Sequence, residues 1–229
     1  MDDIARGRKM MRQNRKAGAV SKITSESARA ALNYAREQFP GRVVTESYLR
    51  LELPASTSNV LQFKVLENEG SAAPSEKRLN VADNFVVTHV GFYNFPTANI
   101  ASNAASVMPL TYVNDGAYGG ANDDDFMKAL YNGFMTIRKN STVFFDAIEM
   151  MNFVCAGTAQ IGNPTNDWQS DAWNGENGYK KIQPYMIFSG TAKNDVTITV
   201  PNQGVTLTTL AARVAVVFRG FLVQGATTK

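Results

Sequence analysis

The stretch Leu49-Arg50-Leu51-Glu52-Leu53 alternates apolar and charged residues, and this period of two predicts a β-strand with one buried face. Leu61-Gln62-Phe63-Lys64-Val65 repeats the alternation after a turn signal at Pro54-Ala-Ser-Thr-Ser58. Successive side chains of a strand point to opposite faces of its sheet, so each segment presents one apolar face to a core. The two segments therefore predict successive strands of a half-buried sheet.

The rest of the chain extends this β pattern. Segment 85–95 is apolar on both faces, as expected for a strand in the middle of a sandwich, and in segment 213–223 Val214, Val216 and Phe218 share one face. Further strands are predicted over 182–188, 196–200 and 205–210, and residues 135–154 predict a hairpin or a strand followed by a short helix. Many short strands separated by turns indicate a mainly β protein with a jelly-roll-like β-sandwich and two or three short helices.

Two helices interrupt the β pattern. The first follows a cap at Thr24 or Ser25, has a mostly alanine stripe and ends at Pro40-Gly41. Such a stripe buries little area, so we expect it to pack closely on a flat surface, with another subunit as one candidate. The second begins at Asp123-Asp124-Asp125, where the carboxylates complement the helix dipole. This structural role is preferred to metal binding.

The predicted organisation has two parts. Residues 1–41 form a basic arm plus a short helix, and residues 42–229 form the β-sandwich body, with long loops near 97–122 and 160–180. No apolar run approaches the ~20 residues that span a bilayer, and the basic start lacks the apolar segment of a secretory signal. We therefore expect no transmembrane segment and no export.

Positive charge is concentrated at the start of the chain. Residues 1–22 carry seven lysines and arginines and two aspartates, a net charge of +5, while the whole chain is +3 and residues 23–229 are therefore −2. The cations expected to contact nucleic acid or a neighbouring subunit are Arg6, Arg8, Lys9, Arg12, Arg15 and Lys16. A basic arm binds phosphates without reading bases, by releasing counterions. The alternatives are a solvated tail or a basic helix on an acidic subunit surface.

Few residues offer catalytic chemistry. His89 is the only histidine and lies in an apolar run, which favours a hydrogen-bonded core or strand histidine over a general base. Cys155 is the only cysteine and is interpreted as a small buried apolar residue, so no disulfide or thiolate metal cluster is expected. We expect no enzyme, no cofactor and no metal. Because the body is close to neutral, any nucleic-acid binding is expected through the arm alone.

Loop 160–180 contains candidate contact residues. Trp168, Trp173 and Tyr179 are predicted to lie at an interface, since aromatic residues are enriched in interface cores. Stacking of these rings on a sugar is the alternative interpretation. Carboxylates in the same loop could bind calcium, but their spacing does not match an EF-hand.

The combined pattern resembles the coat proteins of icosahedral viruses and tailless phages. The resemblance rests on the basic segment 6–16, the two alternating strand segments, residues 133–140 and the closing segment 213–221. It implies a jelly-roll body, self-assembly into a shell as a homo-oligomer with other virion proteins, an arm that contacts the genome or neighbouring subunits, and location in the virion after synthesis in the host cytoplasm. A ligand- or glycan-binding β-sandwich module is the second hypothesis, and an enzyme is the third.

Overall fold

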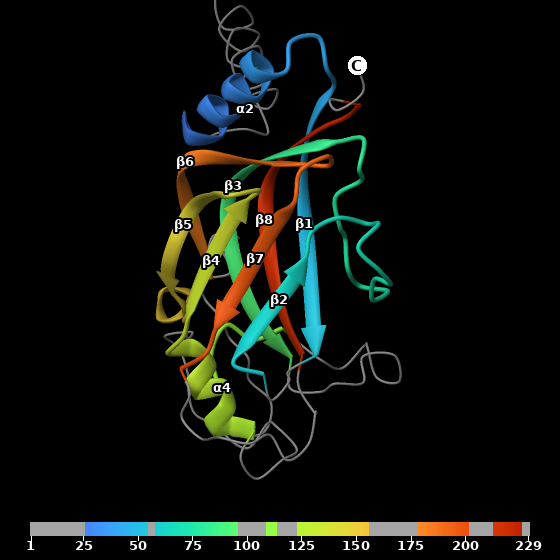
Figure 1. Cartoon of the computed structure of the whole chain (residues 1–229). Helices are drawn as coiled ribbons and strands as arrows, with labels where there is room; N and C mark the ends of the chain where they lie inside the picture. The colour runs from blue at the N-terminus through green and yellow to red at the C-terminus, as the bar shows by residue number, and fades with distance from the viewer. Residues whose placement is uncertain are drawn as a thin grey trace, which may run out of the picture.

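The computed structural model of this protein describes residues 26–54, 58–95, 109–113, 123–155, 178–201 and 213–225. Within these ranges, eight strands form two antiparallel four-stranded sheets that lie one on the other (Figure 1). The prediction of a mainly β protein is confirmed. The basic arm and the predicted strand over 205–210 lie outside the described residues.

The elements follow the sequence pattern closely. In chain order they are α2 (Glu26–Gln38), β1 (Val44–Pro54), β2 (Val60–Lys64), β3 (Asn84–Phe95), α4 (Asp123–Tyr131), β4 (Phe134–Lys139), β5 (Thr142–Glu149), the 3-10 helix η1 (Met150–Phe153), β6 (Tyr179–Ser189), β7 (Asn194–Thr199) and β8 (Arg213–Val223). For residues 135–154, the structure shows both predicted alternatives: β4 and β5 form a hairpin with a turn at Asn140 (φ 53°), and the short helix η1 follows β5.

The strands pair in a nested order. Sheet A has the order β1-β8-β3-β6 and sheet B the order β2-β7-β4-β5. The first strand therefore pairs with the last, β2 with β7, β3 with β6 and β4 with β5, all antiparallel. Only the last of these pairs is a local hairpin, so most of the register depends on contacts between distant parts of the chain.

The core lies between the two sheets. Leu49 and Leu51 of β1 face it, as do Phe63 of β2 and Phe218 of β8, and none of these side chains is more than 2% exposed. The sequence alternation correctly predicted these inward positions. Removing such side chains from water supplies the main favourable free energy of folding.

Helix α2 covers the outer face of sheet A at one end of the sandwich (Figure 1). Ala31 and Ala35 are fully buried there against Val86, Phe221 and Val223. The flat surface predicted for the alanine stripe is therefore sheet A of the same chain. Another subunit, the candidate named from the sequence, is not needed to bury these alanines. Small side chains on the helix allow its backbone to approach the sheet closely.

β1 is an edge strand of sheet A, and the segment that follows β2 covers part of its outer edge. Arg50 and Lys77 exchange backbone hydrogen bonds of 2.8 and 2.9 Å, and Leu66 bridges to Leu79. An exposed strand edge invites pairing with other chains, and this segment occupies the β1 edge over that part of its length.

Candidate functional site

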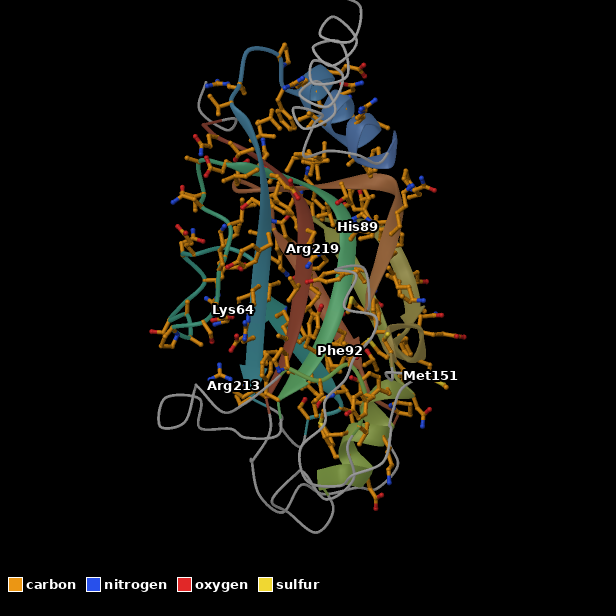
Figure 2. All side chains as sticks on the ribbon, turned by 180° about the vertical axis from the view of Figure 1, so that it is seen from behind. Lys64, His89, Phe92, Met151, Arg213 and Arg219 are labelled. Atoms are coloured by element: carbon orange, nitrogen blue, oxygen red, sulfur yellow. The ribbon has the colours of Figure 1, made fainter. Side chains whose placement is uncertain are left out.

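A row of polar side chains crosses the outer face of sheet A beside α2. Register places Tyr48 of β1 opposite Arg219 of β8, Arg219 opposite His89 of β3, and His89 opposite Lys181 of β6. Residues directly opposite each other in antiparallel strands share one face. We call Tyr48, Arg219, His89 and Lys181 the basic row; Figure 2 shows His89 and Arg219 close together in it.

A β-bulge in β3 brings His89 into the basic row. Val87 pairs with Gly220 and His89 with Arg219, so Thr88 is an extra residue in β3 relative to β8. The Thr88 hydroxyl donates to the Arg219 carbonyl oxygen at 3.0 Å and lies 2.9 Å from His89 Nδ1. His89 is thus a hydrogen-bonded strand histidine, as predicted, but it is half-buried on the outer face and not in the core. Bulges commonly re-aim side chains in this way.

The bulge requires a glycine at position 220. A Cβ atom there would overlap the Val86 carbonyl oxygen and lie 3.2 Å from Val87 Cα, both backbone atoms that cannot rotate away. We expect Gly220→Ala to lower the free energy of unfolding by about 1–3 kcal/mol, because overpacking must be relieved by a backbone shift. Urea unfolding of the two proteins measures this loss. An unchanged unfolding midpoint would contradict the close approach of β3 and β8.

Aromatic rings and cations alternate around the basic row. The Arg219 guanidinium lies 3.9 Å from the centre of the Tyr179 ring, and Tyr179 meets Tyr93 edge to face at 5.8 Å. Lys77 Nζ lies 4.5 Å over the Tyr48 ring. Burial raises the pKa of Tyr93, and its hydrogen bond with Tyr179 raises it further. The edge-to-face contact and the hydrogen bond with Tyr93 help to position the Tyr179 ring.

Next to this face lies a buried ion cluster. The Glu52 side chain is 0% exposed, with Oε1 2.6 Å from Arg50 Nε and Oε2 3.3 Å from Arg213 Nη2. A second pair joins Arg78 and Glu76 at 2.8 Å, and Glu76 also accepts the Glu52 backbone N–H at 2.8 Å. Both carboxylates are neutralised by arginine, so the cluster holds the segment after β2 against β1.

The first half of strand β5 presents apolar side chains at a sheet edge, and its second half carries the exposed acidic residues Asp146 and Glu149. Among the described strands it pairs with β4 alone, and all of its residues are exposed or half-exposed. Val143 is 42% exposed and Phe144 39%, and Phe134 on the adjacent β4 is also 39% exposed. We call Val143 and Phe144 the β5 edge patch; Phe134 pairs with Glu149 at the opposite end of β5 and is not part of it. Apolar side chains beside an unpaired strand edge are typical of a protein contact.

The structure places one of the three predicted loop aromatics. Tyr179 begins β6 and takes part in the ring and cation contacts described above; Trp168 and Trp173 lie outside the described residues. The six predicted arm cations, Arg6, Arg8, Lys9, Arg12, Arg15 and Lys16, also lie outside them. A sugar that stacked on Tyr179, as in the alternative interpretation, would find one face of the ring already covered by the Arg219 guanidinium.

His89 and Cys155 have different neighbours. The Cys155 backbone N–H donates to Thr111 at 3.2 Å, and its carbonyl accepts from the Thr111 hydroxyl at 2.5 Å, while His89 contacts Thr88. Cys155 is interpreted from the sequence as a small buried apolar residue, but the structure shows it only half-buried. In the described part of the chain, no group of three or more histidine, cysteine or acidic residues is placed to hold a metal. No helix within the described ranges is long and apolar enough to cross a bilayer.

Sequence reasoning missed the basic row. Its members come from four strands, and apart from Lys181, which follows Lys180, none has a like-charged neighbour in the sequence. The alternation of each strand gave the only available signal, since it assigns Tyr48 and Arg219 to outward faces. Comparison with known proteins gave no match, either to a family model, to a curated protein or to a solved structure.

Proposed function

We propose that this chain is a structural coat protein that assembles into a virion shell, with a jelly-roll sandwich as its building block. The observation that carries the proposal is the strand order β1-β8-β3-β6 and β2-β7-β4-β5. A jelly roll has eight strands in two sheets and two Greek keys, and its nested pairs follow this order. Jelly rolls are common in viral capsid proteins and also in lectins, so the surface must decide between these uses.

The β5 edge patch favours assembly. A monomeric protein usually protects the edges of its sheets with charges, proline or a covering segment. Here the β1 edge is covered by the segment containing Lys77, whereas β5 exposes Val143 and Phe144. We infer that this edge contacts a second copy of the chain. In the assembled shell, residues 1–22, with their net charge of +5, would reach the genome or a neighbouring subunit.

Electron microscopy and light scattering of the purified chain test the proposal. We expect large symmetric particles, and a chain that stays monomeric at high concentration and at every ionic strength would exclude a self-assembling coat protein. Particles that retain nucleic acid would further support placement in a virion.

The β5 edge patch can be tested by substitution. Phe144→Asp should abolish large particles, because it places a charge in an apolar contact, while the free energy of unfolding of the subunit changes by no more than about 0.5 kcal/mol. Val60→Asp is the matched control: Val60 is 51% exposed on β2, at the opposite edge of the same sheet. Sedimentation velocity compares the particle content of the three proteins. Particle formation by Phe144→Asp at the wild-type level would exclude this edge as the contact.

A further inference from the structure

We propose that the outer face of sheet A beside α2 binds single-stranded nucleic acid, independently of the basic arm. The site consists of the basic row (Tyr48, Arg219, His89 and Lys181) together with Lys77, Arg50 and Tyr179. It is a property of the folded body and does not depend on the coat-protein proposal. It also replaces the expectation that nucleic-acid binding is confined to residues 1–22.

The first argument is the charge of this face. Lys77, Lys181 and Arg219 are exposed and come from three separate segments of the chain. The carboxylates that the strands of sheet A direct to this side are Glu46, toward the α2 end, and Glu52, which is fully buried and paired with two arginines. The face is therefore locally cationic on a body whose net charge is −2 beyond residue 22. A local excess of cations on one face is the electrostatic footprint of a polyanion site.

The second argument is geometry. Neighbouring strands lie ~4.8 Å apart, so the basic row crosses all four strands of sheet A over about 14 Å. Along this line an aromatic ring, a guanidinium, an imidazole and an ammonium follow one another. Two cations are already positioned by rings, Arg219 at 3.9 Å over Tyr179 and Lys77 at 4.5 Å over Tyr48. Cations held in place lose less conformational entropy when they bind a ligand.

The third argument selects the ligand. Tyr48 is 48% exposed on the edge strand β1. Lys77 lies over one face of its ring, which leaves the opposite face to meet a planar ligand group. Proteins that bind single strands combine a cationic track for the phosphates with aromatic side chains on which unpaired bases stack. A duplex keeps its bases stacked on one another, and a lipid headgroup offers no aromatic ring to stack on tyrosine. Single-stranded nucleic acid matches both the cations and the exposed ring.

The test uses the full-length chain with the six arm cations, Arg6, Arg8, Lys9, Arg12, Arg15 and Lys16, replaced by glutamine. This arm-neutral chain should still bind a fluorescein-labelled single-stranded oligonucleotide of about 20 nucleotides, a length sufficient for one site. Fluorescence anisotropy is measured across a range of salt concentrations. Anisotropy reports binding whether or not the chain assembles, so failure here is distinct from failure of the coat-protein proposal. Absence of binding at low salt overturns the inference.

The face is then tested by two matched triple variants of the arm-neutral chain. The site variant loses three charges of the proposed site through Lys77→Gln, Lys181→Gln and Arg219→Gln. The control variant loses three exposed charges from β2, α4 and the turn before β7 through Lys64→Gln, Lys128→Gln and Lys193→Gln. Loss of three phosphate contacts should lower the slope of log K against log salt by about 2. When salt is raised fourfold, the factor by which binding weakens should therefore be roughly 20 times smaller for the site variant than for the arm-neutral chain. The control should keep the slope of the arm-neutral chain.

Equal effects of the two triple variants would show that only net charge matters, and would overturn the site. Stacking is tested separately with Tyr48: Tyr48→Ala should weaken binding about fivefold or more, and Tyr48→Phe should retain it. Equal affinity of the alanine and phenylalanine variants overturns the choice of single strands. Face-dependent binding to phosphatidylserine vesicles without any binding to the oligonucleotide would assign the surface to lipid and overturn the inference.

Discussion

Glu52→Gln should lower the free energy of unfolding by about 3 kcal/mol, near the lower end of the range for breaking a buried ion pair. The Glu52 carboxylate is 0% exposed, with Oε1 2.6 Å from Arg50 and Oε2 3.3 Å from Arg213. Glutamine keeps the shape but removes the charge, which leaves two arginines without their counterion. Their side chains are 29% and 17% exposed, so water compensates for part of the loss.

Urea unfolding of the wild type and the variant, at a concentration too low for assembly, measures this effect. Glu46→Gln is the matched control, because Glu46 lies on the same strand and is exposed; its effect should stay within about 0.5 kcal/mol. Glu52→Leu combined with Arg213→Met should recover part of the stability, since apolar residues can replace a buried pair with little cost. A loss below about 1 kcal/mol for Glu52→Gln would mean that the cluster is well solvated.

Phe218→Ala should lower the free energy of unfolding by about 3–5 kcal/mol, the usual range for removing a buried phenylalanine. Phe218 is fully buried on β8, a strand paired on both sides, and its ring meets Phe188 of β6 edge to face at 5.0 Å. Truncation would leave a cavity between the sheets that neighbouring strands cannot fill without breaking their register. The loss therefore includes both the transfer of the ring to water and the cavity.

Phe144→Ala is the comparison for Phe218→Ala, since both remove the same atoms. Phe144 is 39% exposed on the edge strand β5, so its truncation should cost well under 1 kcal/mol in the isolated subunit. Urea unfolding at low protein concentration measures both variants. Similar losses at the two positions would contradict the assignment of Phe218 to the centre of the core.

Local patterns predicted most of the fold. Leu49 and Leu51, with charged neighbours between them, indicated the inward face of β1 because alternation is a property of a few consecutive residues. Pro40-Gly41 correctly predicted the end of α2, since proline disfavours further helix and Gly41 adopts φ 75°. The strand over 205–210, the arm cations and both tryptophans stay predictions, since they lie outside the described residues.

The sites depended on contacts that no local pattern contains. The alanine stripe indicated a flat partner but not which one, and tertiary packing placed it on Val86 and Phe221 of the same chain. Glu52 reads as an ordinary outward residue of an alternating strand, yet the segment after β2 and Arg213 bury it. Each outcome depends on chain segments far apart in sequence.

The amino-acid sequence by itself determined that this is a mainly β protein, where most of its described strands run and which side chains enter the core, because these properties follow from the period of neighbouring residues. Only the tertiary structure decided the nested strand order, the exposed β5 edge and the basic row. Tyr48, His89, Lys181 and Arg219 lie far apart along the chain, and hydrogen-bonded register alone brings them onto one line. Charge that is dilute in sequence thereby becomes concentrated in space.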